Sequence, residues 1–385
     1  MIFTAPELGE AEVRVLEVVE GLKTRLRHQL HDPRRWAGSL RRVSLARAIQ
    51  GSNSIEGYEA GLDDAVDVAA GEEPLDVNVE TSLALRGYRD AMTYVLQIAE
   101  DEDGFLYSSQ LLKSLHFMMT SYSLGNRPGR WRAGSIYVRN DELGEVVYEG
   151  PGIDQVSMLI EELVAKLNDK QEVNGSIIKA AMAHLNLVMI HPFRDGNGRM
   201  SRCLQSLVLA RDGVLSPVFM SIEEYLGRNT QSYYEVLAQV GGGSWQPERD
   251  TRPWIRYILT AHLRQARTML RRVNESERMW SELERIVSTR RLPDRTIMAL
   301  FDATIGLRVR NATYRSYFGD GPEEITEITA SRDLKQLVDA DLLEPKGERR
   351  GRYYVARPAL VNIRRMVTSM RDKRDDSDPF AAVQR

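Results

Sequence analysis

Apolar residues recur every three or four positions along most of this chain. This spacing is typical of amphipathic helices, because residues three and four apart lie on the same helix face. The runs cover residues 13–26, 83–98, 111–119, 156–167, 177–190, 200–211 and 254–287. The last run is long enough for one or two helices, and the chain as a whole is expected to be mainly helical.

The clearest strand signal is local. Two short runs rich in β-branched and aromatic residues, 135–139 and 145–148, flank a polar connection at 140–144, which ends in glycine. This pattern predicts a β-hairpin. A lone hairpin on a helical body is expected to be a flap rather than part of the core.

Length and composition restrict the class of protein. With 385 residues, the chain is expected to hold two or three units. The net charge of −3 argues against a surface that coats nucleic acid, while leaving room for a local basic patch. The single cysteine, Cys203, excludes a disulfide framework and a multi-cysteine zinc site, as expected in a reducing cytoplasm.

The sequence also bears on localisation. Charged residues interrupt the first thirty positions, and no stretch reaches the roughly twenty apolar residues that span a bilayer. We expect a cytoplasmic protein that is neither exported nor inserted in a membrane.

Residues 191–202, HPFRDGNGRMSR, combine several parts of a phosphoryl-transfer site between two expected helices. Pro192 favours a helix end, which would present His191 outward as a general base. Gly196 and Gly198 allow a tight turn, so that backbone N–H groups and the next helix N-terminus point into one cavity. Such a cavity suits polyphosphate.

The remaining polar residues of this run fit the same chemistry. Asp195 offers an oxygen ligand for Mg²⁺, and Asn197 and Arg199 can donate to phosphate oxygens. Arg202 lies one helical turn beyond Arg199, on the same face.

The other histidines show no metal-ligand spacing and are expected in the core or on the surface. They are His28, His31, His116, His184 and His262. His184 is expected to pack or hydrogen-bond internally.

The run 191–202 resembles the Fic (filamentation induced by cAMP) motif, His-Pro-Phe-x-Asp/Glu-Gly-Asn-Gly-Arg-x-x-Arg, at every defined position. The resemblance implies a helical Fic core that binds ATP and Mg²⁺ and transfers AMP to a Ser, Thr or Tyr hydroxyl of a protein, with self-modification expected. It makes His191 the base and Asp195 the Mg²⁺ ligand. The implied phosphate binders are Gly196, Asn197, Gly198, Arg199 and Arg202.

Two further segments resemble parts of this family. The hairpin at 135–148 follows Arg-Trp-Arg at 130–132 and matches a flap that pairs with the target, which makes Ile136 and Val138 candidates for registering the hydroxyl. An ordinary surface hairpin is the alternative. Tyr233 and Tyr234 resemble a pair near the adenine, with Tyr234 the candidate ligand, although both could be core aromatics.

Residues 52–57, SNSIEG, fit the family's inhibitory motif, Ser/Thr-x-x-x-Glu-Gly/Asn. By this resemblance, Ser52 and Glu56 belong to a short helix against the nucleotide site, and Glu56 pairs with Arg202. An arginine held by a carboxylate is not free to hold a phosphate. A chance match of so loose a pattern is the alternative.

The C-terminal third resembles a winged helix-turn-helix. Helices are expected at 311–318 and 329–343, followed by two strand-like pieces around a basic turn at 346–352. Basic residues there could meet DNA: Arg332, Lys335, Arg349, Arg350 and Arg352. Acidic residues dilute this charge: Asp333, Asp339, Asp341 and Glu344. A protein-docking or homodimer module is the alternative.

These expectations give a domain plan. It has an N-terminal helical region at 1–100, a catalytic core at 101–245, linking helices at 246–290, a winged helix domain at 291–365 and a charged tail at 366–385. The leading function is an autoinhibited protein adenylyltransferase. The alternatives are removal of AMP or transfer of another phosphate-linked group at the same site, and a DNA-binding regulator whose Fic domain senses nucleotide.

Overall fold

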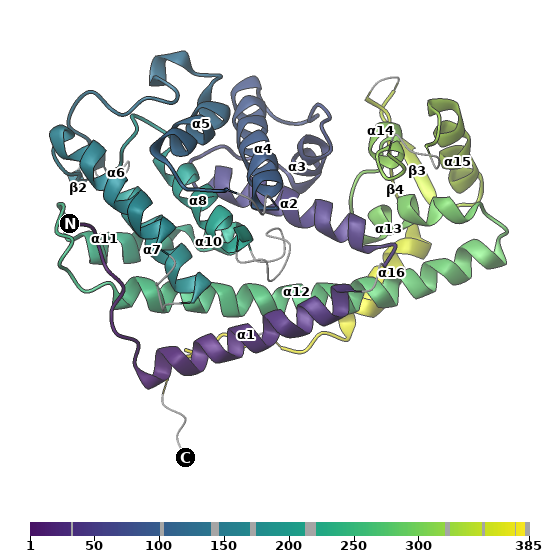
Figure 1. Ribbon diagram of the computed structural model, residues 1–385. Coiled ribbons are helices and arrows are strands. Elements are labelled where there is room, and N and C mark those ends of the chain that lie inside the picture. Colours follow the sequence, from purple (N-terminus) through teal and green to yellow (C-terminus); the bar gives the residue numbers. More distant parts are fainter. Residues whose placement is uncertain are drawn as a thin grey trace.

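The computed structural model confirms a mainly helical fold (Figure 1). The structure describes residues 1–31, 34–100, 104–139, 146–169, 175–211, 221–319, 324–348, 351–373 and 375–381. Within these residues, the strands form two antiparallel two-stranded sheets, β1-β2 and β3-β4.

The elements follow in this order. The first half contains α1 (Glu10–His31), α2 (Ala37–Ser54), α3 (Leu62–Ala69), α4 (Val79–Ala99), α5 (Ser109–Thr120), β1 (Tyr137–Arg139), β2 (Val146–Glu149), α6 (Ile153–Asn168), α7 (Ser176–Ile190) and α8 (Asn197–Arg211). The second half contains α10 (Glu223–Arg228), α11 (Thr230–Gly241), α12 (Arg252–Thr289), α13 (Ile297–Ile305), α14 (Asn311–Arg315), α15 (Glu327–Asp339), β3 (Leu343–Lys346), β4 (Tyr353–Ala356) and α16 (Pro358–Ser369). Short 3₁₀ turns lie at Leu124–Asn126 and Asp294–Thr296.

Helix α12 is the spine of the molecule (Figure 1). Its 38 residues form one helix, about 57 Å long at 1.5 Å per residue. Helix α1 runs alongside it in the same direction, because Glu12 bonds Arg256 and Gln29 bonds Asn274. No helix in the described part of the chain is both long and apolar enough to cross a bilayer.

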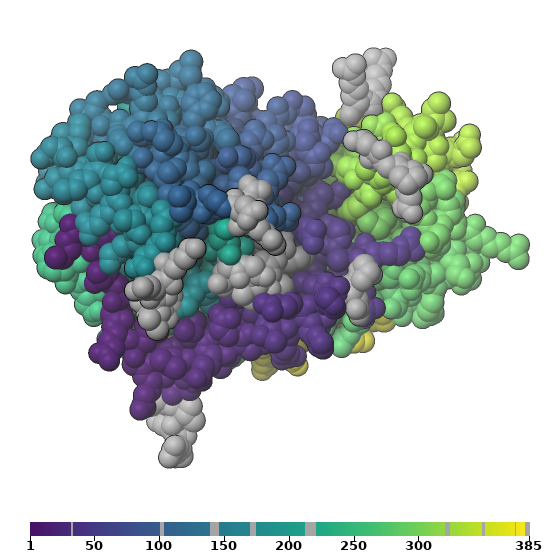
Figure 2. Space-filling view, in the orientation of Figure 1, coloured from purple at the N-terminus to yellow at the C-terminus, as the bar shows by residue number. Residues whose placement is uncertain are grey.

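Two hydrophobic cores share this spine. The first half of α12, from Trp254 to Leu263, packs with α1 to α8 in a large N-terminal core. The second half, from Ala266 to Val287, packs with α13 to α16. In Figure 2, the purple N-terminal residues extend along one edge of the molecule from the teal part to the green C-terminal part. The domain boundaries of the sequence plan stay a prediction.

Helix α7 lies at the centre of the first core. Twelve of its fifteen residues are buried, from Ile177 to Ile190, and it packs most extensively against α8. A helix that is apolar on all sides must be enclosed by others. The turn between α7 and α8, residues 191–196, is therefore fixed at both ends by core helices.

The C-terminal region differs from expectation in two boundaries. Helix α14 ends at Arg315, and α15 ends at Asp339, so Leu343 opens strand β3 instead of closing the helix. The cause is a C-terminal cap, in which Asp341 takes a φ of 59° and the Leu342 N–H donates to Leu337 O. Helices α14 and α15 followed by the β3-β4 hairpin agree with the expected order, while the winged helix function stays a prediction.

The contact between α2 and α10 depends on glycine. A Cβ on Gly51 would lie 2.4 Å from Glu223 O, closer than atoms can approach. We expect Gly51→Ala to lower the free energy of unfolding by about 1–3 kcal/mol, because overpacking outweighs the gain of about 1 kcal/mol in helix propensity. Urea unfolding measures this change.

Gly21→Ala is the matched control. Gly21 lies within α1, and a Cβ there meets no atom within 4 Å. This substitution should raise the free energy of unfolding by up to about 1 kcal/mol. Equal effects of the two substitutions would contradict the close packing of α2 on α10.

Candidate active site

The candidate base lies at the C-terminal end of α7. His191 caps this helix with a φ of 51°, a left-handed conformation that turns the chain toward α8. Its Nδ1 lies 3.1 Å from Val188 O. A carbonyl only accepts hydrogen bonds, so Nδ1 carries the proton and Nε2 keeps its lone pair. Nε2 is therefore the nitrogen of this candidate base that can accept a proton.

Burial lowers the pKa of His191, and the nearby Arg132 adds to this effect. The imidazole therefore stays neutral, and able to accept a proton, to a lower pH than an ordinary histidine.

A buried pair of stacked rings, Phe193 and His116, packs against the loop at residues 191–196. Phe193 is fully buried and stacks on His116 with ring centroids 3.7 Å apart. The Gly129 N–H donates to His116 Nδ1, so Nε2 is protonated and donates to Asp195 O at 2.9 Å. Burial lowers the pKa of His116 to about 4, which keeps this support neutral. His116, expected only in the core or on the surface, is a positioning residue of the loop.

Asn197 makes hydrogen bonds within the loop that the sequence did not predict. Its side-chain oxygen accepts from Phe193 N and its amide nitrogen donates to Phe193 O, both at 2.9 Å. The side chain is buried, so it closes the loop on itself rather than pointing at a ligand. The sequence suggested that this amide contacts phosphate. It could not show the hydrogen bonds to Phe193.

Asp195 lies at the rim of the loop with its side chain 42% exposed. It accepts from Gly196 N at 2.7 Å and from Asn126 Nδ2 at 2.8 Å, one bond on each oxygen. Each carboxylate oxygen retains a second acceptor site. This arrangement fits Mg²⁺, which takes one or two carboxylates together with phosphate and water oxygens.

Two buried arginines line the first turns of α8. Arg199 donates to Tyr122 OH at 3.1 Å and lies over the Tyr58 ring. Arg202 donates through Nε to Ser52 Oγ at 2.8 Å, and through Nη2 to Ser52 O at 2.8 Å and Glu56 Oε1 at 2.6 Å. Among the described residues, Arg199 Nε and Arg202 Nη1 have no hydrogen-bond partner, although both atoms are buried.

These unpaired donors indicate an anionic ligand. A buried N–H without a partner is costly, and forked guanidinium groups match phosphate oxygens. Gly198 has no side chain to fill the space next to these arginines. A Cβ at this position would lie 2.3 Å from Glu56 Oε1 and 3.1 Å from Arg202 Nη1.

The segment 52–57 forms the last turn of α2 and the turn that follows. Helix α2 ends at Ser54, and Gly57, with a φ of 82°, turns the chain away directly after Glu56. The structure thus brings Ser52 and Glu56 onto Arg202, as the sequence predicted.

The two adjacent tyrosines have different surroundings. Tyr233 is buried and hydrogen-bonds to His184, which also bonds Gln205, so both belong to the core. Tyr234 is 45% exposed and donates to Ile55 O at 3.0 Å, beside the Glu56 turn. Of the pair, Tyr234 alone can face a ligand.

The hairpin is present as β1 and β2. Tyr148 OH donates to Met189 O and fixes β2 to α7. Arg132 joins the hairpin base to the loop, donating to His191 O at 3.0 Å through Nε and to Pro192 O through its backbone N–H. Ile136 and Val138 are half-buried along the β1 side. The connection at 140–144 lies outside the described residues.

The candidate DNA-binding residues are only partly placed. Arg332, Lys335 and Arg352 are exposed, while Arg349 and Arg350 lie outside the described residues. Asp333 was expected to dilute surface charge, but it is buried and held by Arg295 at 2.7 Å. DNA binding stays a prediction.

The comparison with known families agrees with this geometry. The sequence pattern of the Fic/DOC family matches residues 106–209, which include the flap, α7, the loop and most of α8. The chain therefore carries a Fic domain. Curated relatives extend the similarity: the "Protein adenylyltransferase Fic" of Aedes aegypti is 32% identical over 173 residues, which cover 45% of this chain and 31% of the relative.

A second relative gives the same result over a shorter region. The "Protein adenylyltransferase fic-1" of Caenorhabditis elegans is 34% identical over 131 residues, or 34% of this chain and 22% of the relative. The chain thus covers less than a third of the length of these curated relatives.

Solved structures show that the fold extends beyond the Fic domain. A Fic family protein from Desulfovibrio desulfuricans G20 aligns with 92% of this chain and 99% of its own, at a TM-score of 0.58 and 21% identity. A Caenorhabditis elegans Fic-1 structure aligns with 67% of this chain and 72% of its own, at a TM-score of 0.52 and 21% identity.

Sequence reasoning missed the residues that hold the Fic loop in place. The basic Arg-Trp-Arg segment before the flap was a signal for Arg132. His116, Tyr122 and Asn126 carried no recognisable signal, because they meet the loop only through tertiary packing.

The two hydrogen bonds between Asn197 and Phe193 can be tested by their effect on the free energy of unfolding. We expect Asn197→Ala to cost about 1–3 kcal/mol for each buried Phe193 backbone group left without a partner. Urea unfolding of Asn197→Ala checks this. Arg194→Ala is the control, since the exposed Arg194 contacts Gly125 O and should change stability by less than about 0.5 kcal/mol. Equal stability of the two variants would contradict this role of the two hydrogen bonds.

Proposed function

We propose that the chain is a protein adenylyltransferase, which transfers AMP from ATP to a serine, threonine or tyrosine hydroxyl of a protein. The observation that carries this proposal is the pairing, within residues 191–202, of a neutral histidine with two buried arginines that have unpaired N–H groups. The names of the curated relatives support the same activity.

His191 would act as general base. Its Nε2 accepts the proton of the incoming hydroxyl as the hydroxyl oxygen bonds to the α-phosphorus. The bond from that phosphorus to the bridging oxygen breaks, and pyrophosphate leaves. Arg199 and Arg202 neutralise the charge of the phosphates, and the loop N–H groups at the start of α8 orient them.

Asp195 would hold Mg²⁺ together with phosphate oxygens. The ion supplies charge neutralisation to the phosphates when bound. Asn126 and Gly196 fix the carboxylate so that it is oriented before the ion arrives.

The flap would position the target segment. Strand β1 pairs with β2, and among the described residues its other edge has no strand partner. Such an edge can add an extended peptide by backbone hydrogen bonds. Ile136 and Val138 lie along it and would register the hydroxyl, while Tyr234 would contact the adenine.

We further propose that Glu56 restrains this activity. The Arg202–Glu56 bond occupies one N–H of the guanidinium that would hold the terminal phosphate. ATP would then bind with its α-phosphate displaced from the attacking hydroxyl. A charge-assisted hydrogen bond of this type contributes about 1.5–3 kcal/mol.

Self-modification tests both proposals by intact-mass analysis after incubation with ATP and Mg²⁺. We expect Glu56→Gly to add adenylyl groups about 10- to 100-fold faster than the wild type, because about 1.5–3 kcal/mol of restraint is removed. Adding His191→Ala should reduce this rate by at least about 10²-fold.

Glu59→Gly is the control for loss of a nearby carboxylate, since Glu59 is exposed and lies three residues after Glu56. It should label at the wild-type rate. Labelling that is equal in the wild type and in Glu56→Gly would remove the restraint, and labelling that survives His191→Ala would remove the catalytic assignment.

The pH dependence of the Glu56→Gly variant follows from His191. Because its pKa is lowered, the neutral base persists as the pH falls through about 6.5. The pH at which half of the transfer rate is lost should therefore lie below about 6.5. A rate already half-lost at pH 6.5 or above, measured with saturating ATP, would contradict this role.

A further inference from the structure

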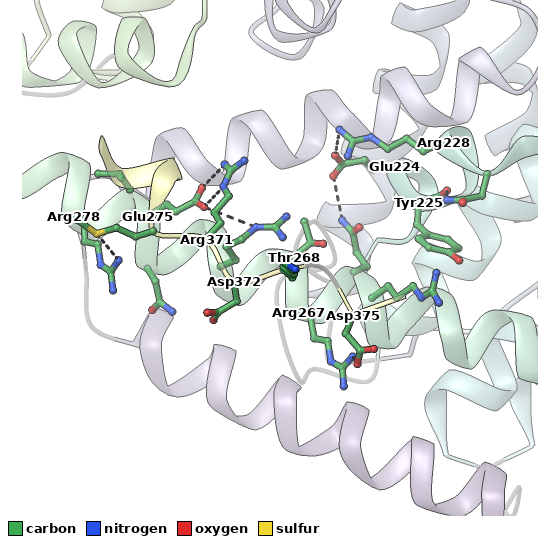
Figure 3. A pocket seen from close by; sticks show the side chains of 18 residues that line it. Glu224, Tyr225, Arg228, Arg267, Thr268, Glu275, Arg278, Arg371, Asp372 and Asp375 are labelled. Atoms are coloured by element: carbon green, nitrogen blue, oxygen red, sulfur yellow. Dashed lines mark hydrogen bonds and ion pairs between the residues drawn. The ribbon is translucent and has the colours of Figure 1, made fainter. Parts of the chain in front are cut away.

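A cavity of about 480 Å³, away from residues 191–202, lies between α10, α12 and residues 370–373 and 375, which follow α16 (Figure 3). Its described lining contains no residue of the 191–202 loop. Seven lining residues are arginine or lysine and four are aspartate or glutamate, a surplus of three positive charges on a chain whose net charge is −3.

The inner wall places several arginines around one carboxylate. Glu224 is 8% exposed and accepts from Arg272 at 2.6 Å, from Arg228 at 2.8 Å and from Arg47 at 3.4 Å. Burial alone would raise the pKa of Glu224, but these arginines lower it to about 2. One negative charge is thus shared by three positive ones.

The crowding of positive charge is visible at Arg47. The pKa of Arg47 is lowered to about 10, mainly by burial; the charges of Arg272, Arg228 and Arg364 also lower it, while Glu224 raises it. Its Nε is buried without a hydrogen-bond partner among the described residues. An additional anion nearby would relieve this repulsion.

A neighbouring cavity of about 250 Å³ is lined by Arg47, Arg272 and Arg364, among other residues. The two cavities share Arg228 and Arg371. Arginine side chains therefore line both cavities, in a number greater than a single phosphate needs.

The outer rim is closed by weak, exposed ion pairs. Arg267 bonds Asp375 at 2.7 Å, with the two side chains 44% and 52% exposed. Exposed pairs contribute about 0–1 kcal/mol. Arg278 donates to the neutral Met370 Sδ and, within the described residues, has no carboxylate within 4 Å. The rim arginines can exchange these contacts for a multiply charged ligand.

We propose that this arginine-lined cavity binds a small ligand with two or more linked phosphates, such as a nucleotide or an inorganic polyphosphate. Guanidinium forks match phosphate oxygens two at a time, and the volume falls in the range of small-molecule sites. Glu224 and Glu275 hold the arginines in place, with Arg371 on Glu275 at 2.6 Å. The phosphates would replace the exposed carboxylates at the rim.

Calorimetric titration of the full chain with inorganic tripolyphosphate, without Mg²⁺, tests the proposal. We expect saturable binding that the double variant Arg267→Gln/Arg278→Gln weakens at least tenfold. Both residues are on the rim, and thermal unfolding should show that the variant folds. Arg285→Gln, with the same type of charge loss on an exposed side chain of α12, should leave binding unchanged.

Arg199→Gln separates this cavity from the Fic loop. Binding that survives Arg199→Gln and is lost in the double variant supports the cavity, whereas the reverse result would overturn it. Equal affinity for citrate would overturn the assignment to phosphate. If the cavity binds phosphates, a comparison of ADP with pyrophosphate distinguishes the two ligand classes. Tighter binding of ADP would identify a nucleotide site, and equal binding would identify an inorganic polyphosphate site.

Discussion

Arg202 is a buried cation, and the arrangement of the site depends on how its charge is satisfied. Removing a charge from water costs several kcal/mol unless it is paired and hydrogen-bonded. In this structure, Ser52 and Glu56 at the end of α2 supply the acceptors. The arginine of the Fic loop therefore fixes α2 against α8, and the same three contacts leave Nη1 without a partner.

The close approach of these helices is possible because glycine lies at the contacts. Gly51 lets α2 meet α10, and Gly198 leaves room for Glu56 beside Arg202. On the other side, Arg132 and His116 hold the backbone of the loop through its carbonyl oxygens. The proposed chemistry would thus use a loop whose shape is set before any ligand binds, so little binding energy is spent on ordering it.

Helical periodicity predicted α1, α4 to α8 and α12, because burial repeats in the sequence at helical spacing. The Fic motif predicted the candidate base and the meeting of Glu56 with Arg202, since these residues belong to recognisable patterns. The predicted end of α15 was wrong, because it depends on a left-handed cap at Asp341. The hydrogen bonds of Asn197 to Phe193 were not predicted, because they depend on the backbone geometry of the loop. The burial of Asp333 and the arginine-lined cavity arise only when distant segments pack together.

The central claim is that Glu56 and the terminal phosphate of ATP compete for Arg202. A crystal structure of the Glu56→Gly variant with ATP and Mg²⁺ measures this directly. The account predicts that Arg202 Nη lies within hydrogen-bond distance, about 3 Å, of a terminal phosphate oxygen while Nε stays on Ser52. An ordered ATP whose terminal phosphate lies away from Arg202, with the arginine still bonded only to Ser52, would contradict it.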